Sequence, residues 1–184
     1  EAAPPLPAPL RPAHHAFTAN AIGLTVQLAL SAAVSFRGCS AVVGLLRDFL
    51  PQFRAIPAPN TAESWLLRVG LHELLRPKEQ ADDWVFLVDH TLQLGALKCL
   101  VIVGIRLAAW EQLQTPLTHH DLTVLTLEPI EKSSGEIVHQ QLEEAAKKVG
   151  VPVAILSDEG SDLIHGAAKF RENEIVETLS TLVD

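Results

Sequence analysis

The fold is decided by the stretch Trp84-Val85-Phe86-Leu87-Val88-Asp89, a continuous apolar run that ends in a carboxylate. A second run, Ile155-Leu156-Ser157-Asp158, also ends in an aspartate. Near-continuous apolar runs of this length are typical of strands buried on both faces. Ligand sites in open α/β sheets lie beyond the carboxyl ends of the strands. If the two strands are parallel neighbours, Asp89 and Asp158 should face one crevice.

Two carboxylates in one crevice predict a site for a hard divalent cation. Oxygen ligands of this kind suit chiefly Mg²⁺, or Mn²⁺ in its place. Two such ions about 3.5–4 Å apart can activate a nucleophile and stabilise a leaving oxygen in phosphodiester chemistry. The alternative is that each aspartate caps the turn after its strand.

The rest of the second half alternates strand and helix patterns. The capping box Ser133-x-x-Glu136 predicts the start of a helix, and Gly150 predicts its end. Asp162 is expected to cap the next helix. The other predicted elements are strands at 99–107, 122–127, 151–156 and 175–183, and a helix at 162–170.

The first half predicts helices after a Pro/Ala-rich tail, which we expect to be disordered over residues 1–17. Polar residues interrupt the apolar run 18–35, which favours a soluble helix capped by Thr18 over a targeting segment. A second helix, capped by Ser40, should end before Pro51, and a third should span 61–75. The side chains expected to face inward include Ile22, Val26 and Leu30, then Val43 and Phe49, then Trp65, Leu66, Val69 and Leu74.

Composition excludes several classes of protein. With 184 residues, 48% apolar and 20% charged, the chain is neither disordered nor fibrous. The net charge of −8 excludes a uniformly basic nucleic-acid coat, but residues 1–81 carry +2 and residues 82–184 carry −10.

Two unpaired cysteines predict an intracellular protein without disulfides. Walker and Gly-x-Ser-x-Gly motifs are absent from the sequence, which makes P-loop hydrolysis and acyl transfer unlikely chemistries. Because the chain has no Met and stops at Asp184, we expect a fragment.

Four motifs resemble a family of bacterial insertion-sequence transposases of the DDE class. Residues 82–95 (DDWVFLVDHTLQLG) and 156–163 (LSDEGSDL) resemble its catalytic motifs, and the predicted strand order resembles its RNase H-like domain. Residues 35–40 (SFRGCS) and 59–71 (PNTAESWLLRVGL) resemble its helix-turn-helix region. The resemblance implies an α/β fold with an RNase H-like mixed sheet (β-β-β-α-β-α-β) over residues 82–184, preceded by a helix-turn-helix over residues 18–77.

The resemblance also implies roles for single residues. Asp89 matches the first catalytic acid and Asp158 the second, and both would bind Mg²⁺ or Mn²⁺. The third acid of such enzymes comes from a later helix, and no acid here sits in a matching motif. Because no third acid is matched, we expect this chain alone to be inactive. The full enzyme would cut and rejoin element ends by attack of water and then of a 3′-hydroxyl on phosphodiesters. The acids available for the third role are Glu172, Glu174, Glu177 and Asp184.

Double-stranded DNA is the partner that the resemblance implies, with a homo-oligomer in the full-length protein and a cytoplasmic, nucleoid-associated location in bacteria. The first alternative is a non-catalytic helix-turn-helix regulator fused to an α/β ligand- or partner-binding domain. The second is a sugar-kinase-like ATPase, which usually has a Gly two residues after the first aspartate, where Thr91 stands here. The candidate DNA-facing residues are Arg37, Arg54, Arg68, His72 and Arg76, and a solvated helix face is the alternative for them.

Overall fold

The computed structural model describes residues 10–12, 14–94 and 97–181. The chain divides into two compact units, residues 1–72 and 73–184, which we call the helical unit and the sheet unit. The predicted tail contacts the helical unit from Leu10 onward: Ala19 N–H donates to Leu10 C=O at 2.8 Å, and the Phe17 ring packs edge-on against Trp65. Within the described part of the chain, no helix is both long and apolar enough to cross a membrane.

The helical unit contains α1 (Ala19–Ser31), α2 (Phe36–Leu46), the 3₁₀ turn η1 (Pro51–Phe53) and most of α3 (Pro59–Leu75). Thr18 caps α1 as predicted, because its hydroxyl oxygen accepts the N–H of Ala21 at 3.2 Å. The predicted cap of α2 is wrong. Ser35 accepts the Gly38 N–H, so the helix begins five residues earlier than expected, and the Ser40 hydroxyl donates to Phe36 C=O inside it.

The core of the helical unit is small, and the predicted inward faces are confirmed only in part: Val43 (0% exposed) and Trp65 (6%) are buried as expected. Ala21, Val43 and Phe53 form its buried cluster. Thr25 is buried as well, since its hydroxyl donates to Ala21 C=O at 2.7 Å and is thereby satisfied. Several side chains expected to face inward are exposed instead: Leu30 (61%), Phe49 (80%) and Val69 (39%).

The sheet unit is built on four strands in the order β3-β2-β1-β4. β1 (Trp84–Leu94) pairs antiparallel with β2 (Leu97–Arg106), and β2 pairs antiparallel with β3 (Thr123–Ile130). β4 (Ala154–Ser157) returns parallel to β1, after the crossover helix α5 (Gly135–Val149). The prediction of a mixed α/β fold is therefore confirmed.

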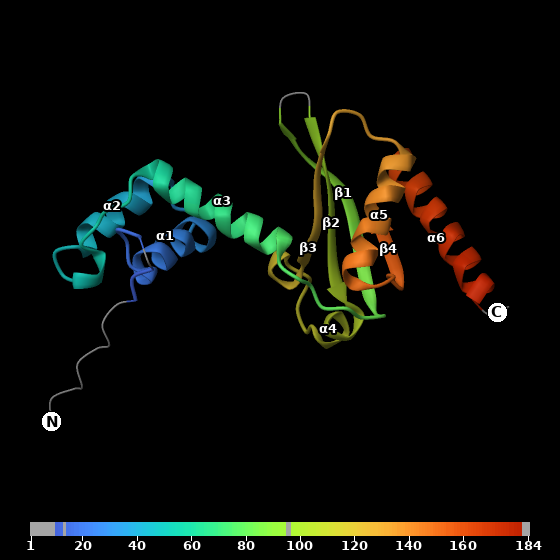
Figure 1. The fold of residues 1–184 in the computed structure, drawn as a ribbon, viewed down its shortest axis with the longest axis horizontal. Helices are drawn as coiled ribbons and strands as arrows, with labels where there is room; N and C mark the ends of the chain where they lie inside the picture. Colours follow the sequence, from blue (N-terminus) through green and yellow to red (C-terminus); the bar gives the residue numbers. More distant parts are fainter. Residues whose placement is uncertain (1–9, 13, 95–96, 182–184) are drawn as a thin grey trace. The chain divides into compact units, whose positions relative to one another are not determined.

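Helices α5 and α6 (Ser161–Thr181) pack on each other and on one face of this sheet, as Figure 1 shows. The core between these layers holds alternate residues of the strands and the inward faces of the helices. Its largest fully buried side chains include Phe86, Leu100, Ile102, Leu125, Leu142 and Leu163.

Two predictions for the elements around this core are wrong. The cap of α5 is Ser134, whose hydroxyl oxygen accepts the Ile137 N–H at 3.4 Å, and not Ser133. Residues 175–181 continue α6 instead of forming a strand. No Gly or Pro follows Gly166 to stop the helix, and each added residue gains a helical hydrogen bond without needing a strand partner. The end of the predicted strand, residues 182–183, lies outside the described residues.

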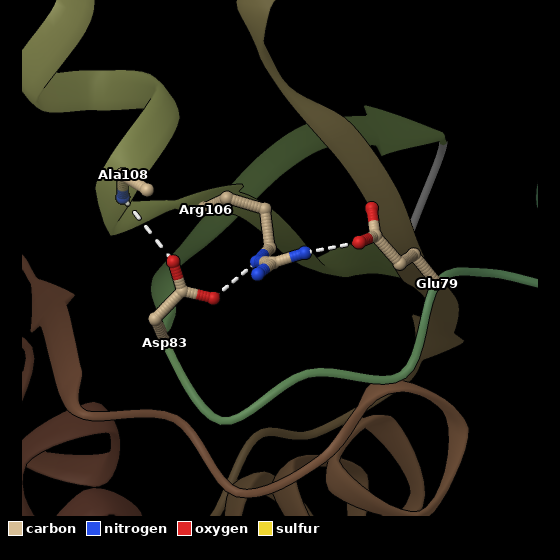
Figure 2. A network of polar contacts seen from close by, with 4 residues as sticks. All are labelled: Glu79, Asp83, Arg106 and Ala108. Carbon is tan, nitrogen blue, oxygen red and sulfur yellow. Dashed lines mark hydrogen bonds and ion pairs between the residues drawn. The ribbon is translucent and has the colours of Figure 1, made fainter.

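An ion-pair network fastens the start of β1 to the end of β2 (Figure 2). The Arg106 guanidinium donates to the carboxylates of Asp83 and Glu79 and lies over the Trp84 ring, 5.9 Å from its centroid. Asp83 also accepts the Ala108 N–H at 3.2 Å, which satisfies a free donor at the start of α4 (Leu107–Gln112). Hydrogen bonding to Arg106 lowers the pKa of Asp83, so this carboxylate stays ionised.

Candidate functional site

Asp89 and Asp158 follow a pair of residues that face each other on neighbouring parallel strands. The last paired residues of β1 and β4 are Val88 and Ser157, and the two aspartates come directly after them. The prediction that these strands would be adjacent and parallel is confirmed. Asp89 does not end its strand, however, because β1 continues to Leu94 and Asp89 pairs with Val101 on β2.

The two aspartates line one hollow of about 590 Å³, which we call the carboxylate hollow. Both aspartates are exposed to solvent. Around them the hollow is mostly apolar, since Leu87 and Leu156 face each other in the β1–β4 register. The lining contains no cationic side chain that would neutralise the two carboxylates. The lining residues are Leu87, Val88, Asp89, Val101, Val103, Leu156, Ser157 and Asp158.

Gly160 shapes the loop that carries Asp158. The Gly160 N–H donates to Asp158 Oδ1 at 3.0 Å, which is the turn-capping contact considered as the alternative role of this aspartate. A Cβ at position 160 would lie 3.0 Å from Asp158 Oδ1 and 3.2 Å from Asp162 Oδ1. Glycine therefore lets the loop bring two carboxylates close to one stretch of backbone.

Asp162 does not join Asp89 in the carboxylate hollow but pairs with His90 and Ser133. His90 Nε2 lies 2.9 Å from Ser133 Oγ and 3.4 Å from Asp162 Oδ2. Burial raises the pKa of Asp162, but hydrogen bonds from Ser133 and the backbone, together with the charge of His90, outweigh it and lower the pKa overall. In a Ser-His-Asp triad, the serine and the aspartate contact different nitrogens of the histidine ring. Here Ser133 and Asp162 both contact Nε2 of His90, so the three residues do not form a hydrolytic triad.

His90 lies next to Asp89 in sequence but makes its side-chain contacts with Ser133 and Asp162. Successive residues of a strand point to opposite faces, so His90 and the exposed Asp89 face different sides of the sheet. The contacts join β1 to the starts of α5 and α6 and thereby hold the loop that carries Asp158. This role of Ser133 was missed in the sequence because Ser133 and Glu136 match a capping box. The serine at position 134, which can cap the helix as well, was the sequence signal that Ser133 is free for another contact.

A third acid for the carboxylate hollow is not found in the described part of the chain. No group of three His, Cys, Asp or Glu side chains there is arranged to hold a metal ion. Glu172 is exposed on α6, and the side chains of Glu174 and Glu177 and the whole of Asp184 lie outside what the structure describes. The stretch His119-His120-Asp121, whose side chains are of metal-binding types, forms a 3₁₀ turn in which the Asp121 carboxylate accepts from Thr118 N–H and Oγ1–H.

The five candidate DNA-facing residues are all exposed but belong to different units. Arg37 lies on α2, Arg54 follows η1, and Arg68 and His72 lie on α3, all in the helical unit. Arg76 belongs to the sheet unit, and its Nε donates to Glu73 Oε2 at 2.5 Å.

The connections in the helical unit differ from those expected. A four-residue turn, 32–35, joins α1 to α2, and it contains Ala33 with a left-handed φ of 50°. The connection from α2 to α3 is much longer, residues 47–58. A short turn between two helices is the mark of a helix-turn-helix pair, so α1 and α2 fit that geometry better than α2 and α3.

No protein-family model matches this chain, and neither the curated proteins nor the solved structures give a significant match.

Proposed function

We propose that the sheet unit is the first part of an RNase H-like catalytic domain of a DDE transposase. Asp89 and Asp158 are two of its metal-binding acids in this proposal. The observation that carries it is the placement of these aspartates, one step beyond paired residues of adjacent parallel strands and in one hollow. The order of three antiparallel strands, a crossover helix and a parallel strand beside the first also supports it.

The donor set fits one Mg²⁺ or Mn²⁺ ion. Two carboxylates offer hard oxygen ligands, and Mg²⁺ usually keeps several waters and takes only one or two carboxylates from the protein. When bound, such an ion polarises a phosphodiester oxygen and lowers the pKa of a water molecule. Asp158 would bind through the oxygen that Gly160 does not occupy. Two acids do not suffice for a pair of ions, so we expect no DNA cutting by this chain alone.

Double-stranded DNA is the substrate in this proposal, and the helical unit would bind it. Arg37, Arg54, Arg68 and His72 would contact phosphates or base edges from their exposed positions. The sheet unit carries most of the negative charge of the chain, which repels DNA until a metal ion neutralises part of it. The full-length protein would cleave element ends and transfer strands, as a homo-oligomer.

A titration of the whole chain with Mn²⁺, followed by calorimetry, tests the metal site. We expect weak uptake that disappears in Asp89→Asn and in Asp158→Asn, because each variant removes one of two charged ligands. Glu159→Gln is the matched control, since it removes a charge next to Asp158 outside the lining of the hollow. Uptake that survives both aspartate substitutions would contradict the proposed site, and efficient nicking of DNA by the chain would contradict its incompleteness.

The non-catalytic regulator is the second candidate, and the bond from Gly160 N–H to Asp158 favours it. In that case Asp158 serves the turn into α6, and the carboxylate hollow takes a ligand or a partner without a metal. No Mn²⁺ uptake by the unaltered chain, together with duplex DNA binding, would support this candidate.

A further inference from the structure

Three cationic side chains line a second hollow of the sheet unit. Its lining has no residue in common with the carboxylate hollow. It measures about 460 Å³, and we call it the cation hollow. Arg76, Lys78 and Lys148 supply its charges, and Leu74, Leu75, Pro77 and Gln80 complete its lining. All of these residues belong to the sheet unit, which contains the last turn of α3, the linker after it and the end of α5.

Hydrogen bonds to backbone carbonyls hold the linker against the end of α5, where the three cations lie. Gln80 Nε2 donates to the carbonyl of Lys148 at 2.6 Å, and Ala81 N–H donates to the carbonyl of Val149 at 2.8 Å. The Lys78 ammonium donates to Glu73 C=O, and the Lys148 ammonium donates to Leu125 C=O at 3.0 Å. These carbonyl contacts orient both ammonium groups without cancelling their charge.

The cations lie near enough to disfavour one another. Burial lowers the pKa of Lys78, and the charges of Arg76 and Lys148 lower it further, against an opposing effect of Glu73. The lining carries three cations and no carboxylate, and Glu73, which lies outside the lining, pairs with Arg76. This excess stands within a half of the chain that is otherwise strongly acidic. A bound anion would relieve the repulsion.

We propose that the cation hollow binds a phosphate group, either from a nucleic-acid backbone or from a free phosphate compound. Arg76 offers a planar donor fork that matches phosphate oxygens, and the two lysines add point charges. Sequence reasoning named only Arg76, because Lys78 reads as part of a polar linker and Lys148 as an ordinary basic residue of a helix end.

The test uses the whole chain in the presence of a chelator, so that the outcome does not depend on the proposed metal site. Pyrophosphate binding is measured by calorimetry, and binding of a short duplex DNA by fluorescence anisotropy at several salt concentrations. We expect the double variant Lys78→Gln/Lys148→Gln to bind about tenfold more weakly, the size of one lost charge-assisted hydrogen bond or more. Lys147→Gln, an exposed neighbour outside the lining, should change the affinity by less than about twofold.

The two probes distinguish the source of the phosphate. Loss of DNA affinity, with a salt slope reduced by about 2, identifies a nucleic-acid backbone. Loss of pyrophosphate binding alone identifies a free phosphate compound. Unchanged binding of both probes in a double variant that is folded by circular dichroism overturns the proposal.

The variant Lys148→Arg distinguishes loss of positive charge from loss of a structural contact. This variant keeps the positive charge and a donor for Leu125 C=O, so it should retain binding. An equal loss in Lys148→Arg and Lys148→Gln would show that the charge does not matter and would also overturn the proposal.

Discussion

The two units bury their apolar residues very differently. In the sheet unit, 13 buried residues form one continuous core between a sheet and two helices. In the helical unit the corresponding cluster has three buried members, Ala21, Val43 and Phe53. A sheet face and two helix faces cover one another, whereas short helices without a covering layer leave much of their surface in water.

The exposed leucines of α3 illustrate this contrast. Leu67 and Leu71, both in the helical unit, lie one turn apart and are 67% and 55% exposed. In the sheet unit, by comparison, Leu100, Leu125 and Leu142 are fully buried. Exposed large apolar side chains occur in both units, since Leu156 (43%) and Ile164 (51%) of the sheet unit are also exposed. What differs is the number of buried residues that pack into one cluster.

The largest change in the free energy of unfolding should come from creating a cavity in the core of the sheet unit. Phe86→Ala should lower the free energy of unfolding of that unit by about 3–5 kcal/mol, because it removes a fully buried ring and leaves a cavity. Amide hydrogen exchange in β1 and β2 measures this unit separately from the other. Phe49→Ala is the matched control in the helical unit; its ring is 80% exposed, and we expect a change within about 0.5 kcal/mol. Equal losses in the two variants would remove the contrast between the units.

Glycine substitutions should have opposite signs in the two units. Gly150 has a φ of 105°, and a Cβ there would lie 2.1 Å from Ala81 C=O, so Gly150→Ala should destabilise the sheet unit by at least about 1–3 kcal/mol. Gly70 lies inside α3 with nothing within 4 Å of an added Cβ. Gly70→Ala should therefore stabilise α3 by about 0.5–1 kcal/mol. Urea denaturation of both variants measures the difference, and a stabilising Gly150→Ala would contradict the close approach of linker and helix.

A smaller, pH-dependent effect should come from Asp162. Its pKa is lowered in the folded state, so its ionised form stabilises the sheet unit above the ordinary aspartate pKa of 3.8. That contribution is lost as pH falls through the lowered pKa. Asp162→Asn should weaken the sheet unit near neutral pH and reduce the fall in its stability below about pH 4. Melting temperatures from pH 2 to pH 7 test this, with the exposed Asp82→Asn as control. Identical pH profiles for Asp162→Asn and the unaltered chain would contradict the role of the cluster with His90 and Ser133.

Local sequence signals were enough to predict the four strands of the sheet unit and helix α5, but not α4 or the continuation of α6 to Thr181. Apolar runs of strand length, the helical periodicity of residues 135–149 and the stop at Gly150 are local signals, and each led to the observed element. The placement of Asp89 and Asp158 in one hollow was predictable for the same reason. Strands that run parallel as neighbours bring equivalent positions to one edge.

Which polar groups meet depends on how the elements pack against one another. Ser133 and Ser134 are locally equivalent as caps, and the contact with His90, 43 residues away in sequence, gives Ser133 its partner. Lys78 and Lys148 lie 70 residues apart in sequence, and the linker held at the end of α5 brings both into the cation hollow. Long-range contacts of this kind depend on how elements pack, which neither periodicity nor spacing along the chain encodes.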